Sequence, residues 1–237
     1  MSFLKAEWRN LAMANYIIDP AILKKYLPTG TEIDLYEGKC FISLIGFMFL
    51  NTKLLGIKIP LHTNFEEVNL RFYVKRFENN TWKRGVVFIK EIVPKPALTF
   101  IANNIYNEHY ETLPMNHHWK KNNFNRTVSY QWGKNNIWYS FMVKAALKSS
   151  IIKPNSEFEF ITEHYWGYAK VSESVTNEYE VTHPRWEHYP VDDFEIKVNF
   201  EAVYGPEFKT LNRMNPNSVI LANGSEITVE NKTKIYI

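Results

Sequence analysis

Hydrophobic and polar residues alternate along much of the chain, as they do in β-strands that have one buried face. Residues 65–74 show the pattern most clearly. Because successive side chains of a strand point to opposite sides, one face carries Val68, Leu70, Phe72 and Val74, and the other carries Glu67, Asn69, Arg71 and Tyr73. The segment therefore predicts a strand with an apolar core face and a polar face.

A second strand is predicted over residues 85–93. Asn79-Asn80 lies in the turn between the two strands, so they are expected to form an antiparallel pair. The same alternation groups Lys90 with Val86, Phe88 and Ile92 on one face, and Glu91 with Val87, Ile89 and Val93 on the other. Residues 40–50 are almost uninterrupted apolar residues, which is typical of a strand buried on both faces.

The rest of the chain alternates turn signals with short periodic runs. Asp19 and Pro20 suit the N-cap and first residue of a short helix, which Pro28-Thr29-Gly30 ends. Helical spacing over residues 97–110 predicts one longer helix, whereas residues 8–16 fit either a strand or a short helix. Further strands are predicted at residues 127–132, 137–143, 158–168, 178–183 and 194–203, and a hairpin within residues 218–237 around Asn223-Gly224.

No repeat, low-complexity tract or linker divides the sequence, so a single domain over residues 1–237 is expected. The predicted fold class is α+β and β-rich, a mostly antiparallel β-barrel or sheet with a few packed helices. Composition supports this prediction, because 16 Phe, 14 Tyr and 7 Trp accompany only 9 Gly. Aromatic side chains are typical of sheets and of the walls of small-molecule pockets.

The charge pattern argues against several classes of partner. The net charge is +3, and 28 Lys and Arg residues are scattered among 25 acidic ones. The one basic stretch, residues 119–126, is interpreted as a solvated loop, so no nucleic-acid partner is expected. The first residues carry charges where a signal peptide needs an apolar core, and no apolar run approaches ~20 residues. The predicted location is the cytoplasm, without a membrane partner.

Metal and cofactor chemistry finds little support in the sequence. Cys40 is the only cysteine, which rules out an intramolecular disulfide and a thiolate metal cage. His109, His117 and His118 lie near Glu108 and Glu111, but their spacing matches no zinc signature, and adjacent histidines on a strand point in opposite directions. Gly-x-Ser-x-Gly and phosphate-loop motifs are absent as well. Neither a metal site nor a cofactor is expected.

Three further residues have both a structural and a chemical interpretation. In the chemical interpretation, His164 and His183 are proton shuttles. In the structural interpretation, which is the default, each histidine forms a hydrogen bond to a neighbouring strand. Lys90 is predicted on an otherwise apolar strand face, where burial lowers the pKa of an amine and permits imine formation. A cross-strand or snorkelling lysine explains the same pattern.

Blocks of residues that span most of the chain, in one order, resemble the YqjF-like family of uncharacterised proteins. They are Phe65-Glu66-Glu67-Val68-Asn69-Leu70-Arg71, Gly85-Val86-Val87-Phe88, Tyr106-Asn107-Glu108, Leu113-Pro114-Met115, His164-Tyr165-Trp166-Gly167-Tyr168 and His183-Pro184-Arg185-Trp186. That family lies within the acetoacetate decarboxylase-like superfamily. The resemblance therefore implies the fold of that enzyme.

Acetoacetate decarboxylase forms a Schiff base between a lysine and its keto-acid, beside an arginine and a glutamate in the same cavity. The resemblance carries the arginine over to Arg9, seven residues before Tyr16, and the glutamate to Glu67, two residues after Phe65. These two residues are thereby implied to share a cavity. The related decarboxylases assemble, which implies a homodimer here.

The lysine pair is the point at which the chain departs from the enzyme. In the enzyme the pair directly follows a proline, and here Met115 and Asn116 follow Pro114. A methionine cannot form an imine with a ketone. The resemblance therefore implies a shared fold without decarboxylation by that mechanism.

The sequence leaves three hypotheses for function. The first is a binding protein whose cavity takes a small anionic or carbonyl-bearing molecule. The second is a lysine-independent lyase, isomerase or hydrolase of small keto or enol acids, with Glu67 as general base and an arginine as electrophile. The third is a structural or interaction protein whose cavity is filled by side chains.

Under the first two hypotheses the polar face of residues 65–74 lines the cavity, and under the third it is a solvated strand face with a cross-strand ion pair. The candidate catalytic residues are Glu67 and Arg71. The candidate ligand-binding residues are Arg9, Asn69, Tyr73, Glu91, Met115, His118 and His164.

Overall fold

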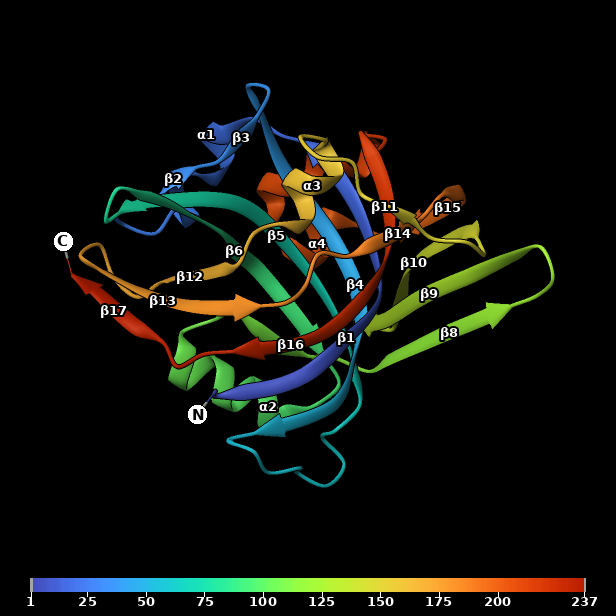
Figure 1. Cartoon of the computed structure of the whole chain (residues 1–237), viewed down its shortest axis with the longest axis horizontal. Coiled ribbons are helices and arrows are strands. Elements are labelled where there is room, and N and C mark those ends of the chain that lie inside the picture. Colours follow the sequence, from blue (N-terminus) through green and yellow to red (C-terminus); the bar gives the residue numbers. More distant parts are fainter. Residues whose placement is uncertain (1, 237) are drawn as a thin grey trace.

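The structure is a computed structural model that describes residues 2–236, most of them in β-strands (Figure 1). The strands are β1 (Leu4–Ile17), β2 (Glu32–Ile33), β3 (Leu35–Tyr36), β4 (Lys39–Leu54), β5 (Phe65–Glu78), β6 (Thr81–Val93), β7 (Tyr110–Thr112), β8 (Met115–Lys121), β9 (Asn125–Lys134), β10 (Ile137–Ala146), β11 (Ser150–Ile151), β12 (Trp166–Lys170), β13 (Val175–Thr182), β14 (Glu187–Tyr189), β15 (Val191–Lys197), β16 (Ser218–Val229) and β17 (Thr233–Tyr236).

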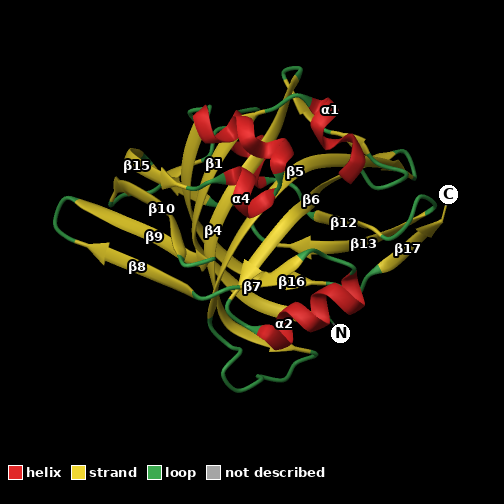
Figure 2. Cartoon of the chain, turned by 180° about the vertical axis from the view of Figure 1, so that it is seen from behind, coloured by secondary structure: helices red, strands yellow, loops and turns green. Residues whose placement is uncertain are grey.

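The helices are short and lie at the ends and sides of the strands (Figure 2). They are α1 (Pro20–Leu23), α2 (Pro96–Ile101), α3 (Glu157–Thr162) and α4 (Phe200–Tyr204), with 3₁₀ turns at Lys24–Tyr26 and Pro206–Arg213 and a π-helical turn at Ala102–Tyr106. Across the described part of the chain, none of these helices has the length and apolar character needed to cross a membrane.

Seven strands close into a barrel in the order β16-β1-β4-β5-β6-β12-β13. Closure comes from β13, whose Val181 and Thr182 pair with Val229 and Thr228 of β16. The pairings are antiparallel except between β6 and β12, which run parallel. A second sheet, in the order β15-β10-β9-β8, packs beside the barrel and projects from it (Figure 1). The predicted fold class, β-rich and mostly antiparallel with a few packed helices, is confirmed.

The protein has two large apolar cores, one on each side of the barrel wall. The outer core lies between the barrel and the second sheet, and includes Val68, Leu70, Phe72, Tyr130, Phe141 and Leu221. Residues of α4 and the following 3₁₀ turn also pack into it. The inner core lies inside the barrel, and includes Leu11, Met13, Phe41, Ile45, Phe47 and Ile220. Strand β5 therefore has no solvent-facing side over most of its length.

Several local predictions are confirmed. Residues 8–16, which fitted a strand or a helix, lie in β1. Asp19 caps α1 by accepting a hydrogen bond from the backbone N–H of Ala21 at 2.8 Å. The β5–β6 hairpin turns at Asn79 and Asn80, which both have positive φ. Asparagine tolerates this left-handed conformation better than most residues.

Two predicted strands contain helices instead. Residues 158–168 are divided between α3 and β12, because Ser156 caps α3 by accepting from the N–H of Glu159 at 3.3 Å. Ser-x-x-Glu is a capping-box signal that outweighs the local alternation. Residues 194–203 are divided between β15 and α4, which begins after the N-cap Asn199.

Two other predicted elements end differently. The helix predicted over residues 97–110 stops at Asn107, which adopts φ 61°. The described residues 218–236 form no hairpin around Asn223-Gly224, because β16 runs through both, and residue 237 of the predicted hairpin lies outside the described residues. Gly224 has φ 76° and faces the backbone of Trp8 so closely that a Cβ would collide with its carbonyl oxygen. The glycine therefore allows two strands to approach closely and does not form a turn.

The predicted faces of residues 85–93 are wrong because β6 contains a bulge. Leu70 pairs with Lys90 but Arg71 pairs with Phe88, so Ile89 is an extra residue. One inserted residue reverses the side on which every later side chain lies. Glu91 consequently shares the inner side of the barrel with Val86 and Phe88, and Lys90 lies on the outer side.

Candidate functional site

The barrel contains a partly open cavity of about 150 Å³. Most of its wall is apolar and aromatic, and includes Trp8, Phe47, Phe49, Phe65, Phe88 and Trp186. A small set of polar side chains interrupts this wall. That combination is typical of sites for small organic molecules.

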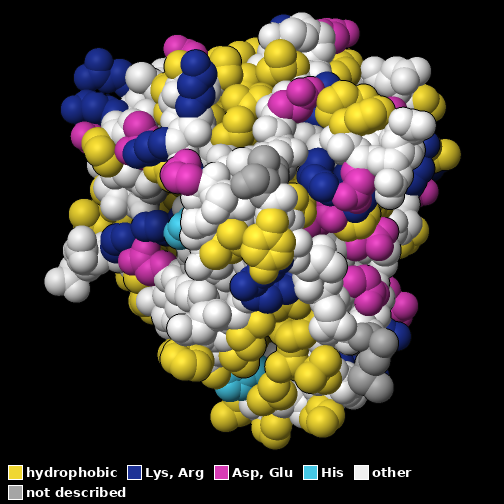
Figure 3. All heavy atoms as spheres, turned by 90° about the vertical axis from the view of Figure 1, so that its left-hand side faces the viewer, with side chains coloured by type: hydrophobic (Ala, Val, Ile, Leu, Met, Phe, Trp, Pro, Cys, Tyr) yellow, Lys and Arg dark blue, Asp and Glu magenta, His cyan; other side chains and the backbone are white. Residues whose placement is uncertain are grey.

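One end of the cavity lies beneath α2. Leu98 and Ile101 of this helix and Leu54 at the end of β4 contribute to the wall. Hydrophobic side chains also gather at the lower end of the molecular surface on the side of the N-terminus and β17 (Figure 3). In the same helix, Phe100 is largely exposed. Helix α2 therefore contributes apolar side chains to the cavity wall.

The polar part of the wall is centred on β5. Glu67, Asn69 and Arg71 line the cavity from alternate positions of this strand. Glu91 joins them from β6, because it pairs with Asn69 and the bulge turns its side chain inward. The polar face predicted for β5 is thus enclosed by the barrel.

Three buried glutamates lie in this region. Glu67, Glu91 and Glu108 are 2%, 3% and 7% exposed. Glu67 Oε1 accepts from Asn69 Nδ2 at 2.9 Å, and its Oε2 lies 3.3 Å from the Tyr110 hydroxyl. Glu108 Oε1 accepts from the Tyr179 hydroxyl at 2.7 Å. Glu67 and Glu108 are thus held by neutral partners, whereas Glu91 Oε2 has none among the described residues.

Burial changes the protonation of this cluster. It raises the pKa of Glu67 to about 7, against hydrogen bonds from Asn69 and Tyr110 that lower it. Burial likewise raises the pKa of Glu108 to about 8. The pKa of Glu91 is raised well above its usual range by burial, and then by the nearby charges of Glu108 and Glu67. At neutral pH the cluster therefore retains protons.

Arg71 is the only Lys or Arg among the described residues that line the cavity. Its Nη2 donates to the carbonyl oxygen of Ile161 at 3.4 Å, and its Nε has no partner. No carboxylate of the described chain lies within ion-pair distance of it. A guanidinium with free donors in an apolar wall is suited to a carboxylate ligand.

His164 forms a second polar centre of the wall. Its Nε2 lies 3.2 Å from Asp34 Oδ2, which also accepts from Arg84 Nε at 2.7 Å. Because a carboxylate only accepts, Nε2 carries the proton and Nδ1 keeps a lone pair. Burial lowers the pKa of His164 to about 4, against the hydrogen bond to Asp34. The imidazole is therefore neutral at pH 7.

Unpartnered polar atoms concentrate at this cavity. Of the eleven buried side-chain nitrogen and oxygen atoms without a protein partner in the described chain, five belong to cavity-lining residues. They are Trp8 Nε1, Asn69 Oδ1, Arg71 Nε, Glu91 Oε2 and His164 Nδ1. Buried polar groups cost free energy unless something satisfies them. The cavity therefore presents both donors and acceptors to a ligand or to water.

The structure brings together five of the nine candidate site residues at this cavity: Glu67, Asn69, Arg71, Glu91 and His164. Tyr73 lies just behind its wall, where its hydroxyl is 2.7 Å from Ser43 Oγ and its ring centroid is 4.8 Å from that of His164. Tyr73 therefore packs against a cavity residue without lining the cavity itself.

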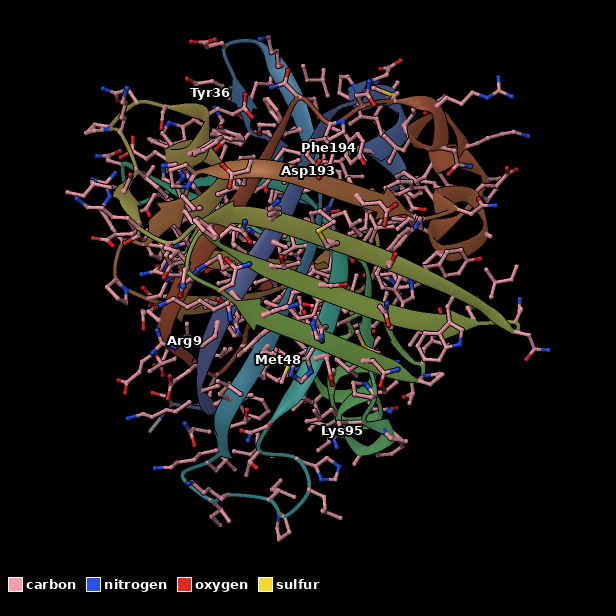
Figure 4. All side chains as sticks on the ribbon, turned by 90° about the vertical axis from the view of Figure 1, so that its right-hand side faces the viewer. Arg9, Tyr36, Met48, Lys95, Asp193 and Phe194 are labelled. Carbon is pink, nitrogen blue, oxygen red and sulfur yellow. The ribbon has the colours of Figure 1, made fainter. Side chains whose placement is uncertain are left out.

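The other three candidates lie elsewhere. Arg9 pairs with Glu7 at 2.7 Å and lies opposite Met48 on the next strand (Figure 4). Trp8, its neighbour in β1, already faces the cavity, so alternation turns Arg9 outward. The expectation that Arg9 shares a cavity with Glu67 is therefore wrong.

Met115 and His118 also lie outside the cavity, because β8 belongs to the second sheet. Met115 packs into the outer core, and His118 is exposed. Lys90 lies on that side of the barrel wall as well, where its Nζ donates to Glu111 Oε2 at 2.9 Å and to the Val203 carbonyl at 2.7 Å.

Sequence reasoning missed several residues of the site. Glu108 and Tyr110 were placed in a helix that in fact ends before them. Tyr179 was assigned to a strand but carried no signal of its inward direction. Asp34 stands alone between two very short strands and gave no signal at all, since its partner His164 lies 130 residues away.

Comparisons with known proteins agree with this fold. The profile of the DUF2071 family, described as an uncharacterized conserved protein, matches residues 5–226. A stretch of 72 residues is 33% identical to the uncharacterized protein YqjF of Bacillus subtilis (strain 168), and spans 30% of this chain and 30% of that protein. The match thus covers less than a third of the relative's length. The resemblance to YqjF-like proteins is confirmed.

The solved structures that resemble the chain share its fold at low sequence identity. Acetoacetate decarboxylase from Legionella pneumophila aligns with a TM-score of 0.66 and 10% identity, over 98% of this chain and 86% of that one. An acetoacetate decarboxylase-like enzyme from Sphingomonas wittichii RW1 gives 0.68 and 9%, over 100% and 94%. The enduracididine biosynthesis enzyme MppR complexed with pyruvate gives 0.64 and 11%, over 99% and 91%.

Proposed function

The chain belongs to the DUF2071 family of uncharacterized conserved proteins and has an acetoacetate decarboxylase-like fold, and from this premise we propose that its barrel cavity binds a small organic acid. The ligand carries a carboxylate, a neighbouring carbonyl and an apolar substituent. A fold alone does not determine function, so the proposal rests on the cavity.

The observation that carries the proposal is the set of five unpartnered polar atoms in an aromatic wall. Arg71 Nε and Trp8 Nε1 are donors without acceptors. Asn69 Oδ1 and His164 Nδ1 are acceptors without donors. A side-chain-filled core would leave such atoms unsatisfied at a cost of about 1–3 kcal/mol each. A ligand with oxygen atoms satisfies the donors.

Charge favours an acidic ligand. The cavity wall contains one cation, Arg71, and its three carboxyl groups hold protons readily at neutral pH because burial raises each pKa. A bound carboxylate would therefore meet a free guanidinium and protonated acids that donate hydrogen bonds. The enduracididine biosynthesis enzyme MppR, which shares the fold at 11% identity, was solved in complex with pyruvate, and this supports a 2-oxo acid as the ligand class.

The proposed ligand is bound without a Schiff base. Met115 occupies the position implied for the catalytic lysine and packs into the outer core. Lys90, the other candidate for imine formation, donates hydrogen bonds to Glu111 and to the Val203 carbonyl on the outer side of the wall. Binding is therefore assigned to Arg71 and its neighbours.

The test is a binding assay with Arg71→Gln and a matched variant, Arg9→Gln. Pyruvate, 2-oxobutanoate and 2-oxo-4-phenylbutanoate are titrated by isothermal calorimetry. We expect the purified protein to bind at least one of them, and Arg71→Gln to weaken it by about 10-fold or more, because a charge-assisted hydrogen bond contributes about 1.5–3 kcal/mol. Arg9→Gln should bind as the unmodified protein does.

Two results would contradict the proposal. One is that none of the three acids binds to the correctly folded protein. The other is that Arg71→Gln and Arg9→Gln bind equally well, since the guanidinium in the cavity would then contribute nothing.

A further inference from the structure

His164 and Glu91 present reactive atoms from different parts of the cavity wall. Neither His164 Nδ1 nor Glu91 Oε2 has a partner among the residues that the structure describes, and both side chains are buried. Arg71 lies between them along β5, because Asn69, two residues before it, pairs with Glu91. Tyr73, two residues after it, has its ring centroid 4.8 Å from that of His164. Arg71 Nη2 is held by the carbonyl of Ile161, three residues before His164. A carboxylate on Arg71 would therefore place its adjoining carbon atoms between an imidazole and a carboxyl group.

We propose that the cavity transfers protons on a bound 2-oxo acid, with His164 as the base and Glu91 as the acid, and so interconverts its keto and enol forms. This inference rests on the proposed function, since the acid must first bind to Arg71. It assigns to His164 the role of base that the sequence had given to Glu67.

The proton transfer needs no further reactant. His164 Nδ1 takes a proton from C3 of the acid, and the electron pair of the broken C–H bond forms the C2=C3 double bond. The carbonyl π pair moves to oxygen, which receives the Glu91 proton. The enol, an imidazolium and a carboxylate result, and the reverse transfers restore the starting groups. Exchange of the imidazolium proton with solvent labels C3.

The starting protonation states suit these roles. Burial keeps His164 neutral, with its pKa lowered to about 4, and keeps Glu91 protonated by raising its pKa. The titratable groups that face His164 are Asp34, Arg84, Arg71 and Tyr73. Those that face Glu91 are Glu67, Glu108, Tyr110, Tyr179 and Arg71. Both groups thus hold, at neutral pH, the form that the reaction needs.

Asp34 is the positioning residue of this arrangement. Its Oδ2 accepts from His164 Nε2, which fixes the tautomer that leaves Nδ1 free, and it would stabilise the imidazolium formed in the reaction. Arg84 holds Asp34 in place at 2.7 Å. Burial alone would raise the pKa of Asp34, but hydrogen bonds from His164 and Arg84 outweigh it and keep the pKa below its usual value.

The experiment follows the C3 protons of 2-oxobutanoate in D₂O by ¹H NMR, with and without the full-length protein. We expect the protein to accelerate their loss, and His164→Gln and Glu91→Gln each to reduce the acceleration by about 100-fold or more. His118→Gln, an exposed histidine outside the cavity, should leave it unchanged. If His164→Gln does not fold, the exchange rate of Glu91→Gln still tests the proposal.

A spectroscopic readout separates positioning from simple loss of structure. In ¹⁵N NMR spectra, His164 should show the Nε2–H tautomer in the unmodified protein. Asp34→Asn should abolish this preference and slow exchange, while 2-oxobutanoate still binds with similar affinity. An unchanged tautomer and exchange rate would remove Asp34 from the mechanism.

The outcomes distinguish this inference from the proposed function. If saturation-transfer NMR detects bound 2-oxobutanoate but C3 does not exchange, or if both His164→Gln and Glu91→Gln exchange at the unmodified rate, proton transfer by these residues is wrong and binding stands. If no 2-oxo acid binds, both are wrong. If borohydride reduction in the presence of the acid labels a lysine, the reaction proceeds through an imine, and the proposed role of His164 as base is wrong.

Discussion

Buried glutamates occupy two regions of the described chain, and each region neutralises them in its own way. Glu178 of β13 lies 3.3 Å from Arg76 Nη1 and 2.8 Å from Lys83 Nζ, so two cations surround it. Glu67, Glu91 and Glu108 line the barrel cavity, where Arg71 is the single cation among the described lining residues. The first region compensates negative charge with side chains, and the second with protons.

The difference separates a structural role from a chemical one. An ion-paired carboxylate such as Glu178 is a fixed charge that ties β13 to the β5–β6 hairpin. A carboxyl group whose pKa lies near 7 or 8 can gain or lose a proton at little cost in free energy. The cavity region is therefore the one for which we propose ligand binding and proton transfer, and we expect the Glu178 region to stabilise the barrel around it.

The largest expected effect concerns the pH dependence of stability in the cavity region. The pKa of Glu108 is about 8 in the folded state against 4.5 for an ordinary glutamate, so its protonated form stabilises the fold below pH 4.5 and this contribution is lost as the pH rises through 8. Glu108→Gln does not titrate and keeps an acceptor for Tyr179. Relative to the unmodified protein, its free energy of unfolding should rise by about 3 kcal/mol between pH 5 and pH 8.

Urea denaturation at several pH values measures this difference. The comparison between variant and unmodified protein matters, because His164 and His183 have lowered pKa values and oppose the trend below pH 6.5. A constant difference across the pH range would mean that Glu108 is ionised in the folded protein, as an ion-paired residue would be.

A smaller effect is expected from removing the ion-paired carboxylate. Glu178→Ala should lower the free energy of unfolding by about 2 kcal/mol, less than for a fully buried pair, because Arg76 and Lys83 are partly exposed and still contact Glu78. Glu173→Ala is the matched control, since Glu173 forms an exposed pair with Lys170. Thermal and urea unfolding at pH 7 should show little change for the control. If both variants lose the same free energy of unfolding, the Glu178 cluster has no special structural role.

The smallest effect is expected at Arg9. Its ion pair with Glu7 is exposed to water, with 37% of the arginine side chain accessible, so Arg9→Gln should change the free energy of unfolding by less than about 0.5 kcal/mol. The same urea titration at pH 7 measures this. A loss comparable to that of Glu178→Ala would show that exposed and buried pairs contribute alike, and the contrast between the two regions would weaken.

Local patterns in the chain anticipated much of the architecture. Alternation along residues 65–74 separated Val68, Leu70 and Phe72 from Glu67, Asn69 and Arg71, and the structure keeps these two faces apart. The N-cap Asp19 and the Asn79-Asn80 turn were also readable, because each depends on side-chain and backbone preferences within a few residues. The capping signal Ser156-x-x-Glu159 was equally local but was overlooked.

The composition of the site depended on contacts that no local pattern contains. Whether the polar face of β5 meets water or a cavity is decided by closure of the barrel through β13 and β16, far along the chain. One bulge at Ile89 turned Glu91 inward, and the pairing of Asp34 with His164 joined residues 130 positions apart. Periodicity specifies the two sides of a strand, but only long-range packing decides which side is enclosed and which charges then keep their protons.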